Sequence, residues 1–204
     1  AEECLKYSVD YLLGPSINII RNPAGGRNCS YHSEDPYLAG ITAAYYIKAL
    51  QSKGIAAVLK HYTANSTEFE RLKSNSRVSA RALREIYLKA FETAVKESNP
   101  WGMMSSYNHV NDKKVCEDYT LITEIPHGEW GWNGIFMTDW WNDSKHTEEL
   151  KAGHDLKMST GDIEGVTQAL ENGELTREQV YACAERVLKT LMKIGRIKNQ
   201  FEKN

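Results

Sequence analysis

Four segments of this 204-residue chain place polar and aromatic side chains directly after short apolar runs. The segments are 25–28 with 33–36, 60–62 with 65, 105–108, and 138–141. In parallel β/α folds, ligands bind where the strands end at their carboxyl side. We therefore expect these four segments to meet in one binding site.

Asp139 ends the apolar run 134–138 and is followed by Trp140 and Trp141. A carboxylate at this place can act as a nucleophile, and an indole beside it can stack on the C–H face of a sugar. The alternative is that Asp139 caps the helix that follows. The polar content of the other three segments favours the chemical role.

Lys60 and His61 follow the apolar run 55–59 without an intervening residue. An ammonium group and an imidazole can hold sugar hydroxyls, and the positive charge favours the ionised form of a nearby Asp139. Arg27 lies in a glycine-rich turn, where its planar guanidinium can bind a diol or orient a carboxylate. It can equally form a loop ion pair with Glu34 or Asp35.

Tyr107 follows the run 102–106 and has two interpretations. Its hydroxyl can donate a hydrogen bond to the nucleophile, or its ring can simply pack.

The elements that must position these residues alternate along the chain. Strand-like runs occur at 11–13 (continuing toward 17–20), 55–59, 102–106, 135–138 and 155–158, and segments of helical period at 35–53, 79–98, 119–130, 144–152, 163–172 and 176–194. Apolar strands that alternate with helices predict an α/β fold with a parallel sheet covered by helices. Ser79 and Thr176 are predicted helix caps.

Composition excludes several classes of protein. The chain is 41% hydrophobic and 25% charged, with only 5 Pro, which is typical of a globular domain and not of disorder. A formal charge of -2 supplies no field for nucleic acid, and no apolar run is long enough to span a membrane. The scattered cysteines and histidines have no metal-ligand spacing, so we predict no metal and no cofactor.

The chain resembles family 3 glycoside hydrolases of the β-glucosidase and β-xylosidase type. The matching segments are LLGPSINI (12–19), GGRN with YHSEDP (25–36), LKHYTAN (59–65), LREIYL (83–88), SYN (106–108), EWGW (129–132), TDW (138–140) and AGHDL (152–156). They occur in the order of the family and cover almost the whole chain. The resemblance implies a (β/α)8 TIM barrel and a retaining mechanism with a covalent glycosyl-enzyme.

By motif match, the resemblance implies that Asp139 is the nucleophile. It also implies a substrate-binding set around the sugar, which consists of Arg27, Lys60, His61, Tyr107, Trp140 and, as a further lining residue, Met104. The segment 62–65 differs from the branch that acts on N-acetylglucosaminides. We therefore expect a β-linked oligosaccharide or glycoside as the substrate, and a β-glucosidase as the parent enzyme.

The same resemblance predicts that residues 1–204 are the C-terminal portion of the barrel, with about five or six of its eight β/α units. The N-terminal strands and a second α/β sandwich domain, which supplies the general acid/base Glu in β-glucosidase-type members, are expected to be absent. A retaining glycosidase needs two carboxyl groups about 5 Å apart. The alternative function is therefore a catalytically incomplete fragment with a partial sugar pocket, which acts with a companion chain or as a homo-oligomer that covers the open barrel edge.

Overall fold

A computed structural model of the protein describes residues 1–197. Its main sheet has four parallel strands in the order β1 (Tyr11–Leu12), β2 (Ala56–Tyr62), β4 (Gly102–Ser105) and β7 (Ile135–Met137). Single bridges extend the sheet, from Ser16 to Lys60 and from Leu156 to Met137. Because these four strands are parallel, all their carboxyl ends meet at one edge of the sheet.

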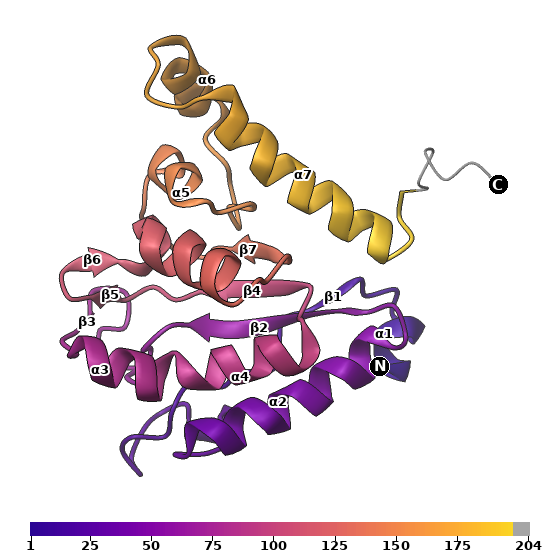
Figure 1. Ribbon diagram of the computed structural model, residues 1–204, viewed down its shortest axis with the longest axis vertical. Coiled ribbons are helices and arrows are strands. Elements are labelled where there is room, and N and C mark those ends of the chain that lie inside the picture. The colour runs from indigo at the N-terminus through magenta and orange to yellow at the C-terminus, as the bar shows by residue number, and fades with distance from the viewer. Residues whose placement is uncertain (198–204) are drawn as a thin grey trace.

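Helices fill the connections between the strands. They are α1 (Glu2–Lys6), η1 (Asn28–Ser30), α2 (Pro36–Gln51), α3 (Ala80–Ala82), η2 (Leu83–Tyr87), α4 (Lys89–Ser98), η3 (Val115–Glu117), η4 (Thr120–Glu129), α5 (His146–Ala152), α6 (Ile163–Glu171) and α7 (Arg177–Lys193). In Figure 1, α2 and α4 lie side by side along β2. After β7, α5 and α6 lie toward the other end of the molecule, and α7 runs back from there toward β1, where Arg196 pairs with Asp10. Among residues 1–197, no helix combines the length and apolarity needed to span a membrane.

The observed alternation confirms the predicted α/β fold with an incomplete parallel barrel. Ser79 and Thr176 accept hydrogen bonds from the backbone amides of Ala82 and Gln179, so both predicted caps are confirmed. The predicted domain runs to residue 204, and its residues 198–204 lie outside the described part of the chain.

Two predicted helices contain wide turns that periodicity did not indicate. The segment 79–98 is divided by the π-helical turn η2, where the Leu88 amide donates to the Leu83 carbonyl. The helix η4 is π-helical and contains Pro126, whose nitrogen has no proton to donate and whose ring crowds the preceding turn.

Apolar side chains form a core on the outer face of the sheet. Ala57, Leu59 and Phe136 are fully buried there and belong to one cluster with Ile47 and Phe91 of the covering helices. The alternate residues of the strands face the other way, because successive side chains of a strand point to opposite faces. Val58, Met104, Ile135 and Met137 form this inner cluster.

A second small sheet is built by strands too short to show periodicity. It contains β3 (Asn75–Ser76), β5 (His109–Val110) and β6 (Lys113–Lys114). Asn111 and Asp112 connect β5 to β6, both with positive φ, as two-residue hairpin turns require. Ser76 pairs with Val110, so this sheet joins the loop after β2 to the loop after β4.

Candidate active site

A cavity of about 540 Å³ lies at the carboxyl edge of the main sheet. Its lining residues are Arg27, Lys60, His61, Arg71, Tyr107, Asp139, Trp140 and Trp141. Every residue predicted to form the site lines this cavity, with the exception of Met104. The sequence analysis did not identify Arg71 as a member of the site.

Asp139 is held at the end of β7 by its neighbours in the backbone. Thr138 donates its amide to the Leu156 carbonyl at 3.0 Å and accepts from the Met158 amide at 2.9 Å through its hydroxyl. Asp139 Oδ1 accepts from the Trp140 amide at 2.8 Å, and Oδ2 faces His61 Nε2 at 3.7 Å. The N-cap of α5 is Lys145, so Asp139 does not cap the following helix.

Lys60 and His61 both line the cavity although they are consecutive in β2. Side chains of consecutive residues in a regular strand point to opposite faces. Here the register shifts: the step from Leu59 to Tyr62 in β2 lies opposite the shorter step from Met103 to Ser105 in β4. This extra residue in β2 is a local bulge, which turns both polar side chains toward the same cavity.

Asn18 fixes the main chain of His61. Its buried amide donates to the His61 carbonyl at 2.8 Å and accepts from the His61 amide at 3.0 Å. Asn18 lies in the matching segment 12–19, but no local pattern assigns it a role, because its contacts with His61 form only in the folded protein.

The imidazole of His61 is neutral at neutral pH. Burial lowers the pKa of His61 to about 4, and the Asp139 carboxylate opposes the shift only in part. Burial also lowers the pKa of Lys60, while Asp139 raises it. The site therefore offers one neutral ring that can both donate and accept, beside cationic groups that can only donate.

Arg27 extends the contacts of His61. Its Nη1 lies 3.4 Å from His61 Nε2, and its Nε forms an ion pair with Glu68. The sequence predicted Glu34 or Asp35 as the ion-pair partner of Arg27, and the observed partner is Glu68. Glu68 Oε2 also lies 3.8 Å from Arg71 Nε, and one carboxylate thus holds two guanidinium groups at the cavity.

Tyr107 contributes a protonated hydroxyl to the cavity. Burial raises the pKa of Tyr107 to about 12, and the neighbouring Asp139 adds to the shift. The hydroxyl accepts from the Trp141 amide at 3.2 Å, and the Arg71 guanidinium carbon lies 5.2 Å from the ring centroid. Tyr107 is buried and lies beside Asp139, so its position is compatible with both interpretations from the sequence, and its role toward the nucleophile stays a prediction.

Met104 lies below the cavity and not in its wall. It is 1% exposed and packs with Val58, Ile135 and Met137 in the inner cluster of the sheet. The aromatic residues differ from it, because Trp140 and Trp141 are 40% and 69% exposed. They form an open apolar side to an otherwise polar cavity.

The fold and the site define a protein of the parallel β/α-barrel class, with a cavity lined by polar and aromatic side chains at the carboxyl ends of its strands. Residues 1–190 match the model described as the glycosyl hydrolase family 3 N terminal domain. The chain belongs to this family.

Relatives of the chain include several glycosidases. It is 43% identical over 91% of its length to an exo-alpha-(1->6)-L-arabinopyranosidase of Bifidobacterium breve, covering 25% of that protein. It is 41% identical over 93% of its length to thermostable beta-glucosidase B of Acetivibrio thermocellus, covering 26% of it. The chain thus spans about a quarter of these relatives.

Solved structures agree with this assignment. Beta-glucosidase 3B of Thermotoga neapolitana in complex with glucose matches 94% of this chain with a TM-score of 0.91 and 42% identity, and the chain covers 28% of it. A GH3 beta-glucosidase of Bifidobacterium adolescentis matches the whole chain with a TM-score of 0.93 and 38% identity, and the chain covers 30% of it.

Proposed function

We propose that this chain forms the nucleophile-bearing part of a retaining β-glucosidase. The single observation that carries the proposal is the position of Asp139, whose Oδ2 lies 3.7 Å from His61 Nε2 in a cavity that the cations Arg27 and Lys60 also line. A carboxylate with an oxygen directed into a cavity of hydrogen-bond donors is suited to attack a bound sugar.

In the proposed reaction, Asp139 attacks the anomeric carbon and forms an ester bond to the sugar as the glycosidic bond breaks. A general acid protonates the departing oxygen, and in the second step a water molecule releases the sugar while the same group takes its proton. Lys60, His61 and Arg27 hold the hydroxyl groups of the glycone, and Trp140 packs against its C–H face.

Asp139 is the one carboxylate among the described residues that line the cavity. We therefore assign the general acid/base to a part of the protein outside this chain. The same observation supports the alternative that the 204-residue chain by itself is an incomplete fragment with a partial sugar pocket, without turnover of its own.

The test is covalent trapping in the full-length protein that contains this chain. A fluorinated mechanism-based β-glucoside with a dinitrophenyl leaving group forms a stable glycosyl-enzyme, and we expect peptide mass spectrometry to find the sugar on Asp139. Asp139→Asn is expected to lower kcat for an aryl β-glucoside by more than about 10³-fold, as removal of a nucleophile does in other enzymes.

Asp162→Asn is the matched control. Asp162 caps α6 outside the cavity, and Asn caps a helix equally well, so this variant should keep the activity of the wild type. Labelling of any residue other than Asp139 contradicts the nucleophile assignment. Aryl β-glucosides, β-xylosides and α-L-arabinopyranosides compared by kcat/KM identify the glycone, and a preference for one of the last two contradicts the glucoside assignment.

A further inference from the structure

Glu149 is a fully buried carboxylate outside the cavity. It lies on α5, is 0% exposed, and pairs with Lys157, whose Nζ is 2.7 Å from Glu149 Oε1. The side chain of Lys157 is itself only 12% exposed. Burying two charged groups costs desolvation free energy, and their mutual attraction is often too weak to offset that cost. A contribution to the stability of the fold is therefore a poor explanation for such a pair.

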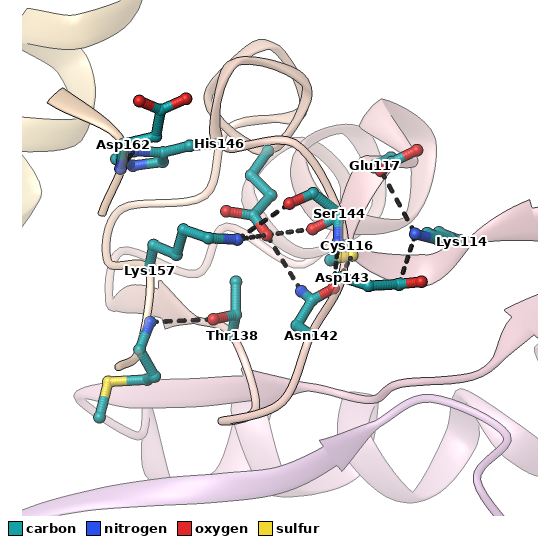
Figure 2. A network of polar contacts seen from close by, with 12 residues as sticks. Lys114, Cys116, Glu117, Thr138, Asn142, Asp143, Ser144, His146, Lys157 and Asp162 are labelled. Carbon is teal, nitrogen blue, oxygen red and sulfur yellow. Dashed lines mark hydrogen bonds and ion pairs between the residues drawn. The ribbon is translucent and has the colours of Figure 1, made fainter. Parts of the chain in front are cut away.

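The contacts of Glu149 converge on the loop that follows Asp139. Glu149 Oε1 accepts from Asn142 Nδ2 at 3.0 Å and from the Ser144 hydroxyl. Lys157 Nζ donates in addition to the Ser144 carbonyl at 3.0 Å. Figure 2 shows Asn142, Ser144 and Lys157 directed toward one another between the loop and the segment that follows α5.

Asn142 is oriented by contacts on its other side as well. Its Oδ1 accepts from the Ser144 amide at 3.0 Å and lies 3.6 Å from Cys116 Sγ. Together with the bond from the Trp141 amide to Tyr107, these contacts fix the loop at points on both sides of the cavity edge. The residues between those points and β7 are Thr138, Asp139 and Trp140.

We propose that Glu149 is a positioning residue for the nucleophile. Its buried charge sets a single conformation of the loop 139–145, and through that loop it sets the direction of Asp139 and of the Trp140 ring. Glu149 itself does not line the 540 Å³ cavity. This inference rests on the proposed function.

The experiment uses the full-length protein and the same fluorinated β-glucoside, which counts active sites and reports the rate of attack by Asp139. In Glu149→Ala, we expect the rate constant of inactivation at saturation to fall by about tenfold or more, since a displacement of about 1 Å can cost 10²-fold. The inhibition constant should change by less than about threefold, because the groups that bind the sugar are intact. Glu149→Gln, which keeps an oxygen acceptor, should recover part of the lost rate.

Two further variants keep the test decisive. Asn142→Ala removes the contacts of a partly exposed side chain with Glu149, Ser144 and Cys116 and leaves the Glu149–Lys157 pair in place, so it should show a smaller loss of the same kind even where Glu149→Ala fails to fold. Glu148→Gln is the matched control, because Glu148 is the preceding residue of α5 and, among residues 1–197, its side chain forms its ion pair with Lys151 at 2.7 Å and makes no hydrogen bond or ion pair with the loop 139–145. It should behave as the wild type.

A purely structural role gives a different result. If a smaller fraction of the variant protein reacts with the fluorinated β-glucoside, but that fraction reacts at the rate of the wild type, the positioning role of Glu149 is overturned. If the wild type reacts at Asp139 and all variants match it, the inference fails while the proposed function stands. If the wild type is not labelled at all, the proposed function fails and the inference with it.

Discussion

His61 and His154 are buried rings and His127 is a half-buried ring, and the fold keeps all three neutral. Burial lowers the pKa of His61 and of His127 to about 4 and that of His154 to about 3. A histidine in the unfolded chain takes up its proton near pH 6.5. The contribution of these histidines to the free energy of unfolding is therefore fully present above about pH 6.5, and it is lost as the pH falls toward their pKa values in the folded state.

Asp155 acts in the opposite direction. Burial raises its pKa to about 6, although Arg186 Nε lies 2.8 Å from Oδ1 and lowers it. As the pH falls, Asp155 therefore takes up a proton at a higher pH in the folded state than in the unfolded state. Its contribution to stability is present at low pH and is lost as the pH rises through about 6.

These directions predict the effect of His154→Asn on acid unfolding. In the wild type, the free energy of unfolding should decrease between about pH 6.5 and pH 4. The variant should reduce this slope by up to about 1.4 kcal/mol per pH unit, which corresponds to one proton. Urea unfolding at several pH values measures it, and an unchanged slope would show that His154 is protonated in the folded state.

At the residue scale, the sequence identified most of the cavity and missed the residues that orient it. Asp139, Lys60 and His61 follow recognisable strands, so their types and positions predicted chemistry. Asn18, Glu68 and Arg71 act through partners distant in sequence, and a single sequence contains no direct sign of such pairings.

At the scale of elements, α2 and α4 pack so closely that one position must be glycine. A Cβ on Gly40 would lie 2.6 Å from Thr93 Cβ and 2.7 Å from the Ala90 carbonyl oxygen. These atoms belong to a helix backbone and a branched side chain, so neither can move aside easily.

We therefore expect Gly40→Ala to destabilise the protein by about 1–3 kcal/mol, the usual cost of overpacking. Gly128→Ala is the control, because a Cβ there meets no atom within 4 Å and the residue lies in the helix η4. Alanine at Gly128 should be neutral or slightly stabilising. Thermal unfolding measures the stability of both variants. Equal stability of Gly40→Ala and Gly128→Ala would contradict the close approach of α2 and α4.

The bulge in β2 also belongs to the scale of elements. A regular strand would direct Lys60 and His61 to opposite faces, and the register shift between Leu59 and Tyr62 places both at the cavity. Neither the bulge nor the wide turns in η2 and η4 has a periodic pattern that the sequence could reveal.

At the scale of the whole molecule, the inner face of the sheet is an apolar surface. Tyr11, Leu13, Met137, Trp140, Leu156 and Met158 line a cavity of about 250 Å³ on this face. In a closed barrel this face is filled by side chains from all strands. The 204-residue chain made alone presents the open part of this face to solvent, where Trp140 and Leu156 are each 40% exposed, together with the edges of its sheet.

We expect this chain, made alone, to associate in solution. Leu156→Lys places a charge on the apolar face and should reduce the association. Leu188→Lys is the matched control, because Leu188 is 47% exposed against 40% for Leu156 and lies outside the cavity. Light scattering measures the mass, and a monomeric wild type with turnover of an aryl β-glucoside would contradict both the association and the fragment alternative.

The sequence by itself determined the alternation of strands and helices, the family, and the residues at the strand ends. These follow from local patterns, because apolar runs, caps and motifs are properties of neighbouring residues. Only the tertiary structure decided that Glu68 holds Arg27 and Arg71, that Met104 packs beneath the cavity, and that Glu149 anchors the loop after Asp139. Each of these depends on side chains brought together across the fold, where burial and charge act over distance in space and not along the chain.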